Sequence, residues 1–109
     1  METDTAGGGE RPVARVDAVL RDLIPEYLQN RRLDVAKLRA WGMEGRGEEM
    51  RRLLHQMKGS GGMYGFPRIT ELARAMEARV AAGEGPMIGP LLGELEAYVD
   101  GVVVEYVEE

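Results

Sequence analysis

Apolar residues recur every three or four positions along most of this chain, which is the spacing of a helix that buries one face. Glycine-rich stretches interrupt these stripes, and prolines or acidic residues precede them, both of which favour the first turn of a helix. We therefore predict one short helix followed by four longer ones. Their expected starts lie at or near Pro12, Pro25, Glu48, Pro67 and Pro90.

The last segment has a second interpretation. Asp100-Gly101 lies between two valine-rich arms, a pattern that suits a hairpin turn. Eight apolar positions between Leu91 and Tyr106 nevertheless keep the helical period, and the arms of the hairpin would be short. We therefore expect a helix that continues to the carboxyl end.

Four long amphipathic helices joined by short glycine loops are typical of a helix bundle. We predict an all-α fold, an antiparallel up-and-down four-helix bundle with a short additional N-terminal helix. The 109 residues suffice for one domain with a single core. Residues 1–11 are glycine-rich and almost without apolar side chains, so burial cannot offset the entropy of ordering them. The expected division is a disordered tail over 1–11 and a helical bundle domain over 12–107.

Composition excludes several classes of function. The absence of cysteine excludes disulfides, thiolate metal sites and thiol catalysis. No apolar run approaches the roughly 20 residues of a membrane span, and the acidic amino terminus is unlike a signal peptide, so we expect a cytoplasmic protein without membrane contact. A net charge of −5 argues against nucleic acid as a partner.

The charge reverses locally around the only histidine of the chain. Residues 51–70 carry four cationic side chains and no acid, so this window is basic within an acidic protein. His55 lies in it, with Lys58 one helical turn ahead and Arg51 and Arg52 one turn back. A phosphoryl group transferred to the imidazole would meet these cations. A solvated helix face explains the two arginines equally well, and a lone histidine is more often a surface residue than a catalytic one.

A run of glycines follows the histidine. Gly59, Gly61 and Gly62 would each cost about 1 kcal/mol relative to alanine inside a helix. Either the helix ends at Lys58 and the glycines form a flexible joint, or it continues and the missing side chains matter. Continuation would place Gly59 and Gly62 on the exposed side with His55, and would turn Gly61 toward the bundle. The apolar positions favour continuation, but composition alone leaves both interpretations open.

Two further observations concern the surroundings of the histidine. Glu77 borders the apolar stripe of the helix that is expected to start near Pro67. Its side chain would either face solvent or turn inward to orient His55. One histidine, no cysteine and no Glu-x-x-His pair provide no ligand set typical of a metal site. We therefore expect no metal and no cofactor bound by this chain.

The run from His55 to Pro67 resembles the motif of the histidine-containing phosphotransfer (HPt) family of bacterial phosphorelays. The matching residues are His55, Lys58, Gly59, Ser60 and Gly65. Met57 stands where leucine is usual, and Gly61 occupies the second small position, which is a mild departure. The likeness covers most of residues 12–106, so the domain over 12–107 is expected to be HPt-like.

The resemblance implies a role for each matching residue. His55 would accept a phosphoryl group on its exposed ring nitrogen, Lys58 would stabilise that group, and Gly59 would keep the access open, with Gly62 beside it. Such proteins are similar to carriers rather than turnover enzymes. The partners implied are receiver domains, one in a hybrid histidine kinase and others in response regulators, and the receiver supplies the Mg²⁺. We expect a monomer.

A hypothesis from another class remains open. The chain would then be a helical adaptor that binds a kinase or a response regulator without accepting phosphate.

Overall fold

The computed structural model describes residues 11–108, and most of this range is helical. The four helices are α1 (Ile24–Glu44), α2 (Gly47–Met63), α3 (Pro67–Ala81) and α4 (Gly89–Gly101). Two short 3₁₀ helices, η1 (Ala18–Leu23) and η2 (Gly85–Met87), precede α1 and α4, and two strands, β1 (Val13–Asp17) and β2 (Val103–Val107), complete the described part. The predicted all-α fold is confirmed in part, because the described residues are mostly helical but also form two strands.

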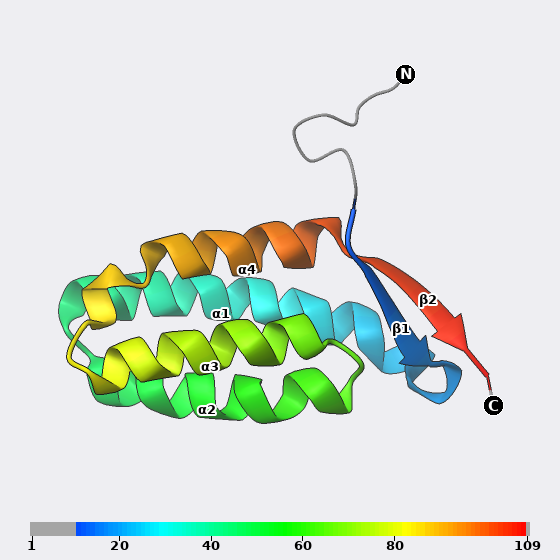
Figure 1. The fold of residues 1–109 in the computed structure, drawn as a ribbon, viewed down its shortest axis with the longest axis horizontal. Coiled ribbons are helices and arrows are strands. Elements are labelled where there is room, and N and C mark those ends of the chain that lie inside the picture. Colours follow the sequence, from blue (N-terminus) through cyan, green and yellow to red (C-terminus); the bar gives the residue numbers. More distant parts are fainter. Residues whose placement is uncertain (1–10, 109) are drawn as a thin grey trace, which may run out of the picture.

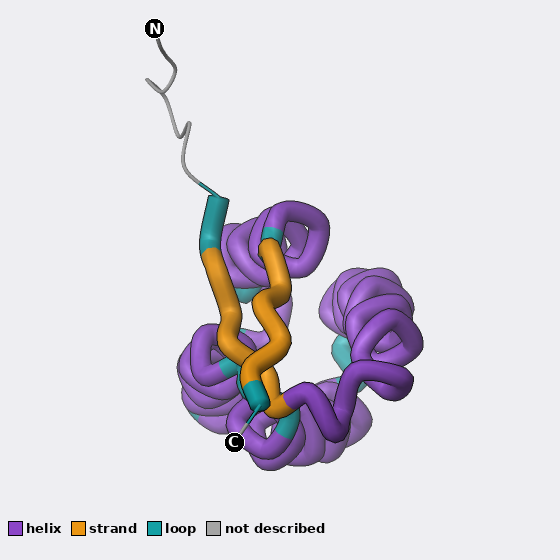
Figure 2. The backbone as a smooth tube through the Cα atoms, turned by 90° about the vertical axis from the view of Figure 1, so that its right-hand side faces the viewer, coloured by secondary structure: helices purple, strands orange, loops and turns teal. Residues whose placement is uncertain are grey.

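The four helices lie side by side, and each runs in the opposite direction to the one before it (Figure 1). α2 packs most extensively against α3, while α1 packs against both α4 and α2. The two strands lie together at one end of the helices, as the end view in Figure 2 shows. No helix among residues 11–108 is long and apolar enough to cross a membrane.

The core is made by the apolar stripes of the four helices and by the segments that join them. Phe66, which precedes α3, is fully buried, and so are apolar side chains from every helix. Among the largest are Ile24, Leu38, Met50, Leu54, Met57, Ile69, Met76, Leu92 and Leu95. Burial of this kind is the main favourable term in folding, so the spacing of these residues decides which face of each helix remains exposed.

Helix α2 continues through its glycines to Met63, so they do not form a flexible joint. A Cβ atom at Gly61 would lie 2.6 Å from Thr70 Oγ1 and 2.8 Å from Thr70 N, which is too close for any side chain. Gly61 therefore allows α2 and α3 to approach each other. The turn between the helices contains Gly65, whose φ of +93° is a left-handed conformation that favours glycine.

The predicted N-terminal helix is wrong over its first half, where the structure has the strand β1, and its second half is the 3₁₀ helix η1. In β1 the side chains of Ala14 and Val16 are buried, and those of Val13 and Arg15 are exposed, which is the alternation of a strand with one covered face. The Asp17 carboxylate then accepts a hydrogen bond from Val19 N at 3.0 Å, which starts η1. The valines of this segment fit both periods locally, and pairing with a distant strand decides between them.

The predicted helix through to the carboxyl end is also wrong in its second half. α4 ends at Gly101, and β2 pairs in parallel with β1 in the register Val13↔Val103 to Asp17↔Val107. Val103 N donates to Pro12 O at 2.8 Å. The alternative hairpin at Asp100-Gly101 is not formed either, because both residues belong to α4.

The predicted disordered tail lies outside the described residues except for Arg11. The Nε of Arg11 donates a hydrogen bond to the carbonyl oxygen of Gly101 at 2.9 Å. Arg11 is therefore tied to the end of α4.

Candidate functional site

His55 projects from the exposed face of α2. Its neighbours Leu54 and Met57 are buried in the core, and a rotation of about 100° per residue turns the imidazole away from them. The side chain of His55 is 71% exposed. The packing of α2 thus presents the ring to an incoming molecule.

Glu77 on α3 reaches across to α2 and contacts two side chains of the site. Its Oε2 lies 3.3 Å from Nδ1 of His55, and its Oε1 lies 2.7 Å from Nζ of Lys58. Its position follows from Met76, which is fully buried and holds this turn of α3 against the core. Of the two orientations that the sequence left open, the structure shows Glu77 turned toward His55, with a side chain only 19% exposed.

The charge of Glu77 determines which nitrogen of the imidazole is free. The hydrogen bond from Lys58 outweighs the effect of partial burial and holds the pKa of Glu77 below its usual value of 4.5. The carboxylate is therefore ionised at neutral pH and can only accept hydrogen bonds. It favours the tautomer of His55 that carries the proton on Nδ1, which leaves the lone pair of Nε2 directed outward.

The two exposed glycines leave space beside the ring. A Cβ atom at Gly59 would meet nothing within 4 Å, and one at Gly62 would meet only Thr70 Oγ1, at 3.8 Å. At these two positions the surface of α2 beyond His55 is therefore bare backbone. A partner protein can approach the imidazole closely along this side.

Thr70 is a residue of this region that the sequence analysis missed. Its hydroxyl donates to the carbonyl of Lys58 at 2.7 Å and accepts from Gly62 N at 2.9 Å. These bonds tie the glycine-rich part of α2 to the first turns of α3. The only signal in the sequence was a hydroxyl residue opposite the glycines, and that relationship requires the alignment of the two helices to be known.

Arg51 and Arg52 lie next to the imidazole without a hydrogen bond to it. Together with Glu48, His55, Gln56 and Glu77, they line a shallow hollow of about 350 Å³. Arg51 pairs with Glu48 at 3.5 Å, and both side chains are exposed. Arg52 forms no ion pair with any residue in the described range. The charges of the two arginines are balanced in the hollow by the carboxylates of Glu48 and Glu77, and neither arginine fixes the orientation of the ring.

Within residues 11–108 there is no group of three or more His, Cys, Asp or Glu side chains that could hold a metal ion. The site described so far is an exposed imidazole, a carboxylate behind it and a partly exposed ammonium group at its side.

A family model described as the Hpt domain matches residues 18–104, which include all four helices and the whole of this site. The chain belongs to the Hpt domain family. The predicted resemblance to the HPt family is thereby confirmed. No curated protein and no solved structure matches the chain.

Membership of this family gives the protein its general role. Hpt domains are phosphotransfer carriers of two-component signalling rather than enzymes, and they interact with receiver domains in phosphorelays. The chemistry of this Hpt domain must therefore use a group that can accept and release a phosphoryl group.

Proposed function

We propose that His55 is the phosphoryl acceptor of this Hpt domain. The phosphoryl group would come from the aspartyl-phosphate of a receiver domain in a hybrid histidine kinase and pass to the receiver domain of a response regulator. The observation that carries the proposal is the contact of Glu77 with Nδ1, which leaves Nε2 of a 71% exposed imidazole as the nucleophile.

The transfer is a displacement at phosphorus. The lone pair of Nε2 forms the N–P bond while the bond between phosphorus and the aspartyl oxygen breaks, and the aspartate leaves with the electron pair. The proton on Nδ1 stays in place, so the phosphorylated ring is cationic and is stabilised by the Glu77 carboxylate. Transfer to the second receiver reverses these steps. The Mg²⁺ that helps to neutralise the phosphoryl oxygens belongs to the receiver.

Lys58 has two possible electrostatic partners in this scheme. In the unphosphorylated protein it contacts Glu77 at 2.7 Å. A phosphoryl group on Nε2 adds negative charge on the exposed side of the ring, and the flexible lysine stem allows the ammonium group to interact with it. We assign Lys58 the role of stabilising the phosphoryl group, and Gly59 and Gly62 the role of keeping the approach open. Arg51 and Arg52 would support this charge at longer range.

The proposal carries further expectations. The chain would act as a cytoplasmic monomer, bind no cofactor of its own and use neither nucleic acid nor a membrane as a partner.

Incubation with a phosphorylated receiver domain tests the assignment of His55. The wild-type protein should acquire an acid-labile, base-stable label, and His55→Gln should acquire none. Label that persists in His55→Gln would contradict the proposal. Binding of the receiver with no label on either protein would support the adaptor hypothesis instead.

A further inference from the structure

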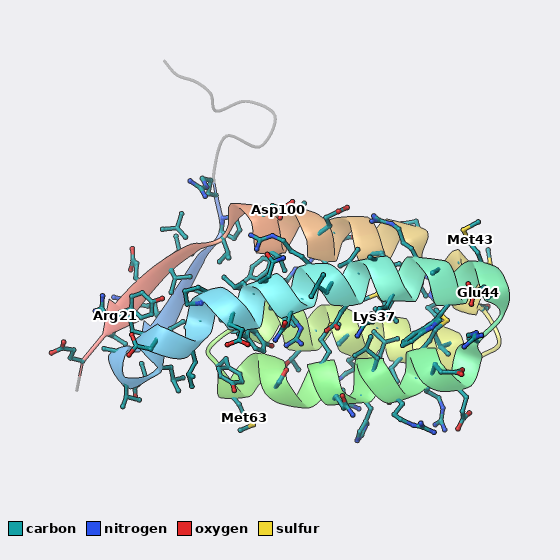
Figure 3. All side chains as sticks on the ribbon, turned by 180° about the vertical axis from the view of Figure 1, so that it is seen from behind. Arg21, Lys37, Met43, Glu44, Met63 and Asp100 are labelled. Carbon is teal, nitrogen blue, oxygen red and sulfur yellow. The ribbon has the colours of Figure 1, made fainter. Side chains whose placement is uncertain are left out.

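A second hollow lies beside the proposed phosphorylation site, between α1 and α2. It has a volume of about 330 Å³ and is lined by Tyr27, Arg31 and Asp34 from α1 and by Leu53, Gln56 and Ser60 from α2, among others. α1 and α2, which form its two walls, lie alongside each other in Figure 3. Gln56 also lines the hollow around His55, so the two depressions adjoin at this residue.

The floor of this groove holds a buried ion pair. Arg31 Nε donates to Asp34 Oδ2 at 2.8 Å, and the two side chains are only 15% and 7% exposed. The guanidinium of Arg31 stacks on the ring of Tyr27, 4.4 Å from its centroid. The hydroxyl of Tyr27 is in turn hydrogen-bonded to that of Ser60, with 2.9 Å between the two oxygens. These contacts fix the pair in one orientation.

The pair has hydrogen-bonding capacity that the described residues do not use. Its one hydrogen bond joins Nε and Oδ2, and no residue within 11–108 contacts Oδ1 of Asp34 or the Nη groups of Arg31 through a hydrogen bond. Burial raises the pKa of Asp34 despite the neighbouring arginine, so the carboxylate is in an unfavourable environment. A buried pair of this kind adds little to stability, whereas it can supply specificity when a partner satisfies the free groups.

We propose that this groove is a recognition subsite for the receiver domain and takes the carboxamide of an Asn or Gln side chain from it. The inference rests on the proposed role of His55. The amide N–H would donate to Oδ1 of Asp34, and the amide oxygen would accept from the Nη groups of Arg31.

The chemistry of the pair favours a neutral group. A carboxamide offers a hydrogen-bond donor and an acceptor in one plane. These match Oδ1 of Asp34, which accepts, and the Nη groups of Arg31, which donate. The ion pair is already balanced, so a charged side chain would add a charge without a counter-ion in a poorly solvated place.

The position of the groove also favours the receiver as the occupant. A receiver placed over His55 covers Gln56, which is shared by both hollows. On the other side of the ring, Glu77 is already paired with Lys58, and α2 packs closely on α3. The same partner therefore has a ready contact on the α1 side.

The test separates docking from chemistry by using a small phosphoryl donor and a large phosphoryl acceptor. The small donor needs no docking surface, whereas the acceptor is a whole receiver domain. Phosphoramidate, a small molecule, labels His55 directly, and the labelled protein is then mixed with increasing concentrations of receiver domains from the source organism. The groove variants are Asp34→Asn and Arg31→Gln. Arg39→Gln is the matched control, because it removes an arginine of the same helix from an exposed pair with Glu96 (2.9 Å) on the α4 side.

Labelling by phosphoramidate should be unchanged in all three variants. The receiver concentration that gives half of the maximal transfer rate should rise on the order of tenfold in the groove variants and stay constant in Arg39→Gln, since a hydrogen bond to a charged group is lost. Asn30→Lys provides a variant for which folding is not in question, because Asn30 is exposed at the edge of the groove. It should raise the same concentration by placing a charge there.

The outcomes are distinct. If wild-type His55 accepts no label from phosphoramidate or from a receiver, the proposed function fails. If it transfers normally and the groove variants match Arg39→Gln, the recognition subsite is wrong while the function stands. For a receiver that responds, changing each surface Asn to Asp and each Gln to Glu should reveal one loss that is not additive with Asp34→Asn. Absence of such a position would overturn the carboxamide.

Discussion

Lys58 Nζ lies 2.7 Å from Oε1 of Glu77, so the lysine nearest the imidazole in sequence is held by a carboxylate on the neighbouring helix. The other oxygen of the same carboxylate lies 3.3 Å from Nδ1 of His55. Glu77 thus links the cation and the imidazole electrostatically. Any change at Glu77 affects both, which makes it the most informative position to substitute.

Glu77→Gln should slow phosphoryl transfer by about tenfold. The amide keeps the shape of the side chain and can still accept a hydrogen bond from Nδ1, but it no longer stabilises the cationic phosphorylated ring. Rapid-quench measurement of a single turnover from a phosphorylated receiver provides the rate. Glu71→Gln is the control, because Glu71 is an exposed carboxylate of α3 that pairs with Arg68 at 3.3 Å, and it should leave the rate unchanged.

Lys58→Ala should reduce the transfer rate on the order of tenfold without unfolding the bundle. The lysine side chain is partly exposed, so its loss removes no core contact. It removes the positive charge that would stabilise the phosphoryl group. The same single-turnover assay measures the effect, with circular dichroism as the check on folding. Lys37→Ala, which removes an exposed lysine of α1, is the matched control. An unchanged rate in Lys58→Ala would remove this residue from the mechanism.

Alanine substitutions at two glycines of α2 should have opposite effects on stability. Gly59→Ala places a methyl group in open space and improves helix propensity, so the free energy of unfolding should rise by up to about 1 kcal/mol. Gly61→Ala places one 2.6 Å from Thr70 Oγ1 and should lower the free energy of unfolding by about 1–3 kcal/mol. Urea denaturation measures both. Equal effects would contradict the close approach of α2 and α3 at Gly61.

A larger side chain at Gly59 should separate stability from access. Gly59→Leu should leave the urea midpoint at or above that of the wild type, because nothing lies within 4 Å of the added Cβ. It should nevertheless slow transfer from a receiver domain and leave labelling by phosphoramidate unchanged. If transfer from the receiver is also unchanged, the partner does not approach along this side of His55.

The stability provided by Glu77 should depend on pH in one direction. Its pKa in the folded protein is lowered from the usual 4.5, so its stabilising contribution is complete above pH 4.5 and is lost as the pH falls through the lower folded-state pKa. The difference in unfolding free energy between the wild type and Glu77→Gln should therefore shrink as the pH falls below about 4.5. A difference that stays undiminished well below pH 4.5 would contradict the contact with Lys58.

The helices were predictable because their signals are local. The helical spacing of the apolar residues of α2 can be recognised within that segment alone. Prolines mark the start of α1 and α3. The strands were not predictable in this way. Val13 and Val103 are 90 positions apart, and each valine-rich segment fits a helix until its partner is known.

In the site, too, features within one helix were predictable from the sequence, and contacts between helices were not. Sequence spacing alone indicates that His55 and Lys58 belong to adjacent turns of one helix, whereas it left open whether Gly59 continues that helix. The contact with Glu77 and the bonds of Thr70 depend on how α3 is rotated and shifted against α2, which no period within one helix specifies. The groove at Arg31 and Asp34 depends on a third element, α1, and so is further from what the sequence indicates.

The pairing of β1 with β2 sets the boundaries that a functional fragment of this protein must respect. The family match begins at residue 18, directly after β1, and ends at residue 104, inside β2. A fragment cut at those limits keeps every helix but exposes surface that Val16, fully buried in β1, now covers next to Gly65. Because Gly65 lies in the turn that follows α2, trimming either terminus is expected to loosen the far end of α2 as well as the strands themselves.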